Sequence, residues 1–175
     1  NLNILEQLCL VGSNGRGALE YRPDRSVMAD PDFSTFSQLA LEADKILRDD
    51  DYSGDRIEEL VRRGGSPGGA RPKIFVHADG KEWLVKFRAR YDKKNIGREE
   101  YHYAQLARNC GIEMPDVKLF DNEWFGVERF DRTPAGKVHV VSAAGLLRAD
   151  YRIPCMDYRH LFALTMRLTH SMEEV

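Results

Sequence analysis

The spacing of apolar residues predicts helices in the first third of the chain. After Asp32, which suits an N-cap, apolar residues recur at intervals of three or four, as on one face of a helix. This stripe consists of Phe33, Phe36, Ala40, Ala43 and Leu47. A shorter helix is predicted after Asp55, and its apolar residues are Ile57, Leu60 and Val61. The earlier segment "ALEYRP" (18–23) has the pattern of a short strand.

The middle of the chain alternates between strand pairs and helices. Strand-like runs in "KIFVHADGKEWLVKFR" (73–88) flank Asp79-Gly80, and runs in "DVKLFDNEWFGVERFD" (116–131) flank Asp121-Asn122, so two hairpins are predicted. Between them we expect a helix from roughly Ile96 to Cys110, ended by Gly111. A further strand is predicted in "KVHVV" (137–141) and a final helix in "MDYRHLFALTMRLTH" (156–170). This order predicts an α+β fold with an antiparallel sheet.

Composition and charge are those of a globular protein. The 175 residues can bury one ordinary core, with 42% of them hydrophobic and 31% charged. The formal net charge of −2 gives no global attraction to nucleic acid or membrane, so an anion site must come from a local cluster. We see neither a membrane span nor a secretory leader, and expect a cytoplasmic protein. The cysteines Cys9, Cys110 and Cys155 are too far apart for a disulfide framework or a zinc site.

The glycine-rich segment "RRGGSPGGARPK" (62–73) has two interpretations. Its backbone N–H groups could surround a phosphate, because glycine allows close approach to the main chain. The same composition suits a flexible basic linker, and taken alone the segment favours the linker. The choice therefore depends on the residues that follow.

The strand after this segment carries Lys86 among apolar neighbours. Such a lysine can simply reach solvent from an edge strand, but a glycine loop, two strands with a lysine, and a helix also form the nucleotide site of protein kinases. There, a glutamate of the helix pairs with the lysine. Glu99 and Glu100 both qualify, and Glu100 is the better partner because it continues a stripe that we expect to face the core. That stripe is Tyr103, Ala107 and Cys110; alternatively, both glutamates are solvated near the helix N-terminus.

The segments "SPGGARPK", "WLVKF", "EYHYAQLARNCGIEMPD" and "GVERFDR" together resemble the HipA family of bacterial toxin kinases. The resemblance extends from the "GRGAL" turn near Gly15 to the last predicted helix, and "ERFDR" is its most specific part. It implies a serine/threonine kinase with a distant protein-kinase-like fold. The chain would correspond to the N-lobe, with an antiparallel sheet and flanking helices, and would lack the catalytic C-lobe.

The resemblance implies a role for each matching residue. The loop from Ser66 to Lys73 corresponds to the phosphate-binding loop, and Ser66 to a serine that such kinases autophosphorylate; its phosphate would place negative charge where the nucleotide phosphates lie. Lys86 would hold the nucleotide and Glu100 would orient Lys86. Glu128 to Phe130 match the adenine hinge, and Asp131 could reach the ribose. The expected ATP-binding residues are Ser66, Gly68, Gly69, Ala70, Arg71, Lys73, Lys86, Glu100, Glu128, Arg129, Phe130 and Asp131.

The sequence also departs from the HipA pattern. Kinase chemistry needs an aspartate at the attacking hydroxyl and ligands for Mg²⁺, which in HipA-like kinases lie in a later "H-x-K-N"-like loop. Nothing similar occurs before Val175, and neither Asp150 nor Asp157 is followed by the required asparagine. We therefore expect no catalytic or metal-binding residue here. The expected parts are a partial N-terminal subdomain (1–60), a kinase-like nucleotide-binding lobe (61–141) and the truncated start of a helical region (142–175).

Two functions of different classes fit these observations. In the first, the chain is the ATP-binding part of a kinase that phosphorylates a protein target, by resemblance an aminoacyl-tRNA synthetase, and so arrests growth; the chain alone would be inactive. In the second, it is a non-catalytic module that binds a DNA-binding antitoxin or another subunit, and its exposed apolar surface would favour self-association. Direct nucleic-acid binding through Arg62, Arg63, Arg71 and Lys73 is disfavoured by the acidic balance elsewhere.

Overall fold

The computed structural model describes residues 3–26, 71–89, 91–150, 153 and 155–174. The helices predicted after Asp32 and Asp55 lie outside the described residues, as does most of the glycine-rich segment. The chain divides into two compact units, Asn1–Val138 and His139–Val175, and each is described by itself.

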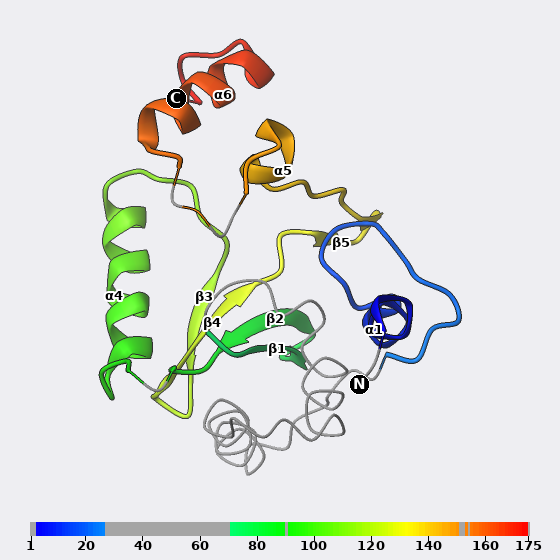
Figure 1. Cartoon of the computed structure of the whole chain (residues 1–175). Helices are drawn as coiled ribbons and strands as arrows, with labels where there is room; N and C mark the ends of the chain where they lie inside the picture. The colour runs from blue at the N-terminus through cyan, green and yellow to red at the C-terminus, as the bar shows by residue number, and fades with distance from the viewer. Residues whose placement is uncertain (1–2, 27–70, 90, 151–152, 154, 175) are drawn as a thin grey trace. The chain divides into compact units, whose positions relative to one another are not determined.

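The first unit is built on a four-stranded antiparallel sheet with the order β1-β2-β4-β3 (Figure 1). Its strands are β1 (Lys73–Ala78), β2 (Lys81–Lys86), β3 (Val117–Phe120) and β4 (Trp124–Glu128). Asp79 and Gly80 both have positive φ, 54° and 74°, and so do Asp121 and Asn122, 50° and 55°. Tight turns between twisted strands require this conformation, and both predicted hairpins are confirmed.

One face of the sheet carries the main hydrophobic core. Strand residues alternate between faces, and the register sets Ile74 opposite Val85 and Val76 opposite Trp83 on the same face. The buried cluster consists of Ile74, Val76, Trp83, Val85, Phe87, Phe120 and Trp124. Edge-to-face ring contacts, with centroids 5.8 Å apart for Trp83–Phe120 and 5.3 Å for Phe87–Trp124, join residues of both hairpins. The two hairpins thus share one core.

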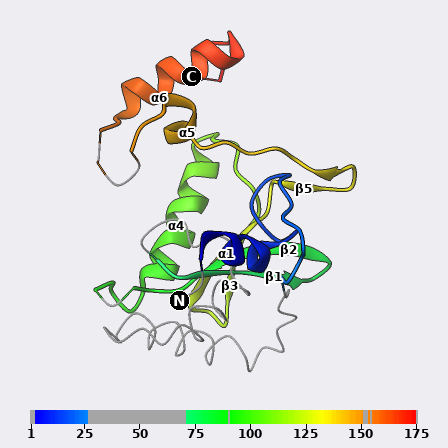
Figure 2. The same ribbon diagram turned by 45° about the vertical axis from the view of Figure 1, so that its right-hand side comes forward.

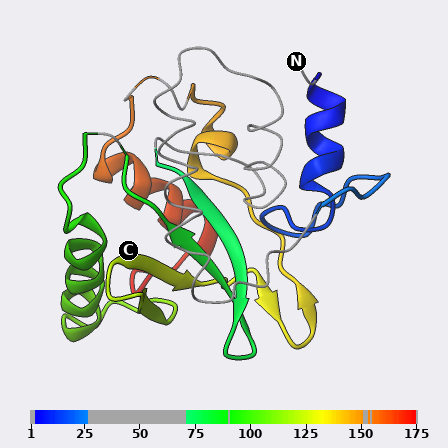
Figure 3. The same ribbon diagram turned by 90° about the horizontal axis from the view of Figure 1, so that it is seen from below.

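Helix α4 (Ile96–Asn109) packs beside β3 and β4 (Figures 1 and 3). The helix approaches the turn between β3 and β4 very closely at Gly97, where an added Cβ would lie 2.1 Å from the Glu123 carbonyl oxygen. The predicted helix is confirmed, and Gly111 follows it with φ 86°. The predicted inward stripe is wrong, because Tyr103 is 72% exposed and Cys110 is also exposed. The buried residues of α4 are Gly97 and Ala104, and the small side chains there let the helix approach the strands.

The N-terminal segment starts with helix α1 (Ile4–Val11), whose N-cap Asn3 and Glu6 form a capping box. The strand predicted at 18–23 is absent. The amide of Tyr21 donates to the Gly12 carbonyl and that of Arg25 to Cys9, so this backbone folds back on the end of α1 rather than pairing with a strand. Figure 2 shows the segment after α1 returning toward β2 and β5.

After β4 the chain forms a small hairpin of two strands, β5 (Arg132–Thr133) and β6 (Gly136–Lys137), each of two residues. The strand predicted over 137–141 is therefore mostly wrong, since only Lys137 of that range is in a strand. The Val138 amide donates to the Asp131 carbonyl, 3.0 Å away, where the hairpin ends.

The second unit contains helices α5 (Ala143–Leu147) and α6 (Tyr158–Thr169). The final predicted helix is confirmed as α6, and it starts with a capping box between Asp157 and His160. Large apolar side chains of α6 are exposed, among them Tyr158, Phe162, Met166 and Leu168. In the described part of the chain, no helix combines the length and apolar character needed to cross a membrane. All three cysteines are free thiols.

A lysine pair and an ion-pair network form the candidate functional site

Lys73 and Lys86 lie directly opposite each other in the register of β1 and β2. Like charges at opposed positions of an antiparallel pair repel, so such an arrangement favours a site where negative charge is supplied. Burial lowers the pKa of Lys73, and the positive charges of Arg16 and Lys86 lower it further, while Glu100 opposes them. The local field is therefore positive at the start of β1, as the binding of a phosphate group requires.

Glu100 of α4 supplies part of that negative charge. Its Oε2 accepts a hydrogen bond from Lys86 Nζ at 2.8 Å, so the ion pair predicted from the sequence is present. Lys86 Nζ also lies 5.1 Å from the centroid of the Phe125 ring, and this cation–π contact restricts the movement of the amine. Glu99, the rejected candidate, instead accepts from Asn95 and Lys93 at the start of the helix.

Arg71 binds the other carboxylate oxygen of Glu100. Its Nη1 donates to Glu100 Oε1 at 2.5 Å, and its Nε and Nη2 donate to the two oxygens of Asp92 at 2.7 and 2.9 Å. The hydrogen bond from Arg71 holds the pKa of Asp92 below its ordinary value. Asp92 was not predicted as a site residue: it stands in an irregular loop, and no spacing in the sequence connects it to Arg71.

A small pocket lies where the start of α4 meets the loop after β2. The charged residues of its lining are the cations Arg71, Lys86, Arg88 and Lys94 and the acids Glu100 and Glu123. Positive charge therefore exceeds negative charge among these groups. Of these cations, Lys86, Arg88 and Lys94 are the ones that suit phosphate oxygens, because Arg71 already pairs with Asp92 and Glu100.

The predicted hinge residues divide into exposed and buried side chains. The Phe130 side chain is 64% exposed, as an apolar wall for a ligand requires, and Glu128 accepts from Lys81 at 2.7 Å. Arg129 and Asp131 are each only 4% exposed. The amides of Glu128 and Arg129 already donate to the carbonyls of Asp116 and Glu82.

Arg129 and Asp131 hold the N-terminal segment against the sheet. Asp131 Oδ2 accepts from the Gly17 amide at 2.7 Å and from Arg129 Nη2 at 2.9 Å, while Arg129 Nη2 also donates to the Gly15 carbonyl at 2.7 Å. Arg129 stacks on the Phe75 ring at 3.9 Å. Burial alone would raise the pKa of Asp131, but hydrogen bonds from Arg129 and Gly17 outweigh it and lower that pKa. Asp131 Oδ1 accepts from Arg129 Nε at 3.0 Å, so both of its oxygens serve this network, and the suggested ribose contact stays a prediction.

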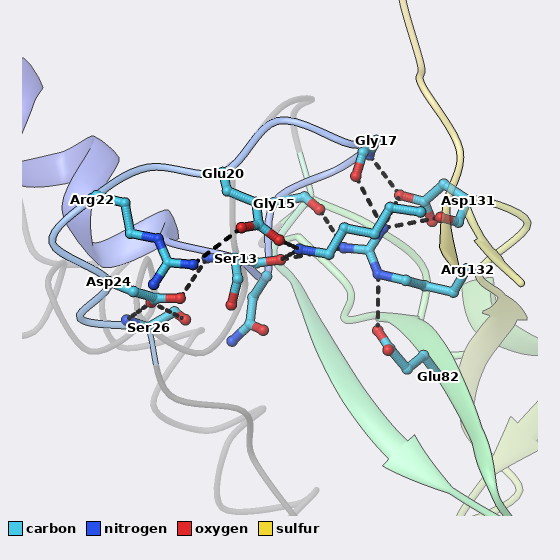
Figure 4. A network of polar contacts seen from close by, with 12 residues as sticks. Ser13, Gly15, Gly17, Glu20, Arg22, Asp24, Ser26, Glu82, Asp131 and Arg132 are labelled. Carbon is cyan, nitrogen blue, oxygen red and sulfur yellow. Dashed lines mark hydrogen bonds and ion pairs between the residues drawn. The ribbon is translucent and has the colours of Figure 1, made fainter. Parts of the chain in front are cut away.

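Further basic residues, which the sequence did not single out, complete this network (Figure 4). Arg132 donates to the carbonyls of Gly15 and Gly17 at 2.8 and 3.0 Å, and Lys137 donates to Ser13 at 2.9 Å and to Glu20. Glu82 of β2 balances part of the charge, 3.3 Å from Arg129. The partners of Arg132 and Lys137 in the N-terminal segment are more than a hundred residues away, so only the fold reveals them.

Four of the predicted site residues, Ser66, Gly68, Gly69 and Ala70, lie outside the described residues, so the structure gives no account of the loop or its phosphorylation. Among the residues that the structure does describe, no group of three or more His, Cys, Asp or Glu is arranged to hold a metal ion.

Comparisons with known proteins identify the family of the chain. A family model described as "HipA-like C-terminal domain" matches residues 65–175. The curated protein named "Putative kinase Y4dM" from Sinorhizobium fredii (strain NBRC 101917 / NGR234) is 23% identical over 169 residues, which cover 87% of this chain and 40% of that protein. The chain therefore spans about two fifths of the length of this relative. No solved structure gives a significant match.

Proposed function

Because the chain belongs to the HipA-like C-terminal domain family, we propose that its sheet and α4 form the nucleotide-binding N-lobe of a HipA-type protein kinase. The observation that carries the proposal is the 2.8 Å ion pair between Lys86 of β2 and Glu100 of α4. In protein kinases a strand lysine held in this way binds the α- and β-phosphates of ATP. The neighbouring Lys73 adds a second cation on the same face of the sheet.

The whole kinase would transfer the γ-phosphoryl group of ATP, with Mg²⁺, to a serine or threonine of a protein target. By resemblance the target is an aminoacyl-tRNA synthetase and the partner a DNA-binding antitoxin, so that translation and growth stop. Ser66 would be the autophosphorylated residue. The present chain contributes nucleotide-binding groups, and no H-x-K-N-like loop occurs within its sequence. We expect the purified chain to transfer no phosphoryl group from labelled ATP to a protein.

Titration of the purified chain with ATP and Mg²⁺ tests the nucleotide site. We expect saturable binding, and Lys86→Ala should weaken it at least tenfold, because a charge-assisted contact to phosphate contributes roughly 1.5–3 kcal/mol. Lys93→Ala is the matched control: Lys93 is a lysine of the neighbouring loop whose partner is Glu99, 3.4 Å away. Equal binding by wild type and Lys86→Ala would rule out the role given to Lys86.

A non-catalytic interaction module is the second candidate, and the exposed Tyr158, Phe162 and Met166 of α6 favour it. Such a module would bind a partner subunit or a second copy of the chain through apolar contacts. The same titration separates the two: a chain that binds no nucleotide but self-associates in sedimentation experiments would be a module.

A further inference from the structure

Arg71 connects three parts of the first unit that are separate in sequence. It directly precedes Pro72 and β1, it binds Asp92 in the loop between β2 and α4, and it binds Glu100 on α4. Asp92 is itself held, because its Oδ2 accepts from the Ala89 amide at 2.7 Å. A bidentate arginine–carboxylate pair of this kind fixes the guanidinium plane.

The carboxylate of Glu100 is consequently bound from two sides. Lys86 holds Oε2 and Arg71 holds Oε1, so rotation of the carboxylate would break at least one hydrogen bond. We infer that Arg71 is a positioning residue, which, anchored by Asp92, holds Glu100 in the orientation that presents Lys86 to a nucleotide. This inference rests on the proposed nucleotide-binding function and adds to it a residue that acts through Glu100.

The alternative is that Arg71 contacts the nucleotide itself, as the resemblance implied. The geometry speaks against this, because Nε, Nη1 and Nη2 each donate to a carboxylate oxygen. The Arg71 side chain is about one-third exposed, and those of Asp92 and Glu100 are less exposed still. Three of the five guanidinium N–H groups, one on each nitrogen, therefore donate to carboxylates of the protein.

Charge balance explains why a second cation is needed at Glu100. Arg71 and Lys86 carry two positive charges, and Asp92 and Glu100 two negative ones, so the four side chains are neutral together. When Lys86 shares its hydrogen bonds with a phosphate, Glu100 loses part of its counter-charge and would repel the incoming anion. Arg71 remains on Oε1 and limits that repulsion.

A double-mutant cycle in the purified chain tests the inference, with ATP-Mg²⁺ affinity as the measurement. Arg71→Gln should weaken binding about tenfold, the loss expected for one charge-assisted hydrogen bond. In a Glu100→Gln background the same substitution should have no further effect on affinity, because the carboxylate through which Arg71 acts is absent. Arg71→Lys, which keeps the charge but not the bidentate geometry, should fall between wild type and Arg71→Gln. Arg98→Gln is the control: Arg98 is an arginine at the start of α4 that donates to the Asn122 carbonyl instead.

Two results would overturn the inference. Unchanged affinity in Arg71→Gln would show that Arg71 is not needed, and an equal loss in wild-type and Glu100→Gln backgrounds would show that it binds nucleotide directly. Thermal unfolding of each variant identifies any that fail to fold. If Arg71→Gln is one of them, the milder Arg71→Lys is compared with wild type in its place.

A second measurement needs no nucleotide and separates failure of the inference from failure of the proposed function. The rate at which an amine-acylating reagent modifies Lys86, followed by mass spectrometry, reports how firmly Glu100 holds that amine. Arg71→Gln and Glu100→Gln should both raise the rate several-fold, while the rate at Lys118, which pairs with Asp79, stays constant. If wild type binds no ATP, the proposed function fails and the labelling still decides the inference: unchanged labelling of Lys86 in Arg71→Gln refutes it.

Discussion

Gly97 provides a stringent test of how α4 positions the ion pair. An alanine Cβ at this position would lie 2.1 Å from the Glu123 carbonyl oxygen and 3.1 Å from the Phe125 amide nitrogen, and both are backbone atoms. Ordinary contact begins at 3.4 Å, so helix and turn would have to separate by roughly 1.3 Å. In an unhindered helix the same substitution would stabilise the protein by about 1 kcal/mol. Here we expect a net loss of about 1–3 kcal/mol, as in other overpacked sites.

The same displacement should weaken nucleotide binding. Glu100 lies one helical turn after Gly97, and a shift of this size would lengthen the 2.8 Å contact with Lys86 beyond hydrogen-bonding range. Urea unfolding followed by tryptophan fluorescence measures the stability, and ATP titration measures the site. The control is Gly80→Ala in the β1–β2 turn. There φ is 74° and an added Cβ would meet nothing within 4 Å.

Gly80→Ala should cost about 1–2 kcal/mol through backbone strain but leave nucleotide affinity unchanged, because α4 does not move. A Gly97→Ala variant as stable as wild type would refute the close packing of α4. A destabilised Gly97→Ala variant with wild-type affinity would show instead that the site does not depend on the position of α4.

Two further predictions concern buried polar groups. Asp131→Asn should lower stability at pH 7 by about 3 kcal/mol, since it removes one of the two carboxylates that pair with the buried Arg129, Glu82 being the other. Because the folded-state pKa of Asp131 is lowered, its contribution is complete above about pH 4 and is lost as the pH falls through the lowered value, so the variant should show a smaller acid-induced loss than wild type in unfolding experiments. Trp83→Phe should cost about 1 kcal/mol more than Trp124→Phe, because Trp83 Nε1 donates to the Ala78 carbonyl at 3.0 Å, whereas Trp124 Nε1 has no hydrogen-bond partner in the described part of the chain. Equal costs in urea titrations would refute that difference, and an unaltered acid profile in Asp131→Asn would refute the first.

Elements determined by local chemistry were predictable from the sequence. The turns at Asp79-Gly80 and Asp121-Asn122 need backbone conformations that these residues accept, and the alternation of the flanking strands then defines the hairpins. The strand predicted at 18–23 failed because its local pattern does not reveal that Tyr21 binds back to Gly12. A strand exists only where a partner strand is available, and that depends on the whole fold.

The inward face of α4 was predicted from the wrong residues although the conclusion about Glu100 was right. Large side chains such as Tyr103 were expected to face the core, but the close approach at Gly97 leaves room there only for small ones. Glu100 is three residues from Gly97 and four from Ala104, so it shares their face. Pairing with Lys86 therefore follows from backbone proximity, which hydrophobic periodicity does not encode.

The "ERFDR" motif shows the limit of assigning roles by resemblance. Its matching positions implied contacts with a nucleotide, yet the side chains of Arg129 and Asp131 are directed at residues Gly15 and Gly17 of the N-terminal segment. A role in nucleotide binding and a role in holding the N-terminal segment are compatible if Arg129 and Asp131 fix the backbone from which Phe130 extends. A motif can then be essential to a ligand site while most of its side chains never touch the ligand, because they hold in place the segment that does.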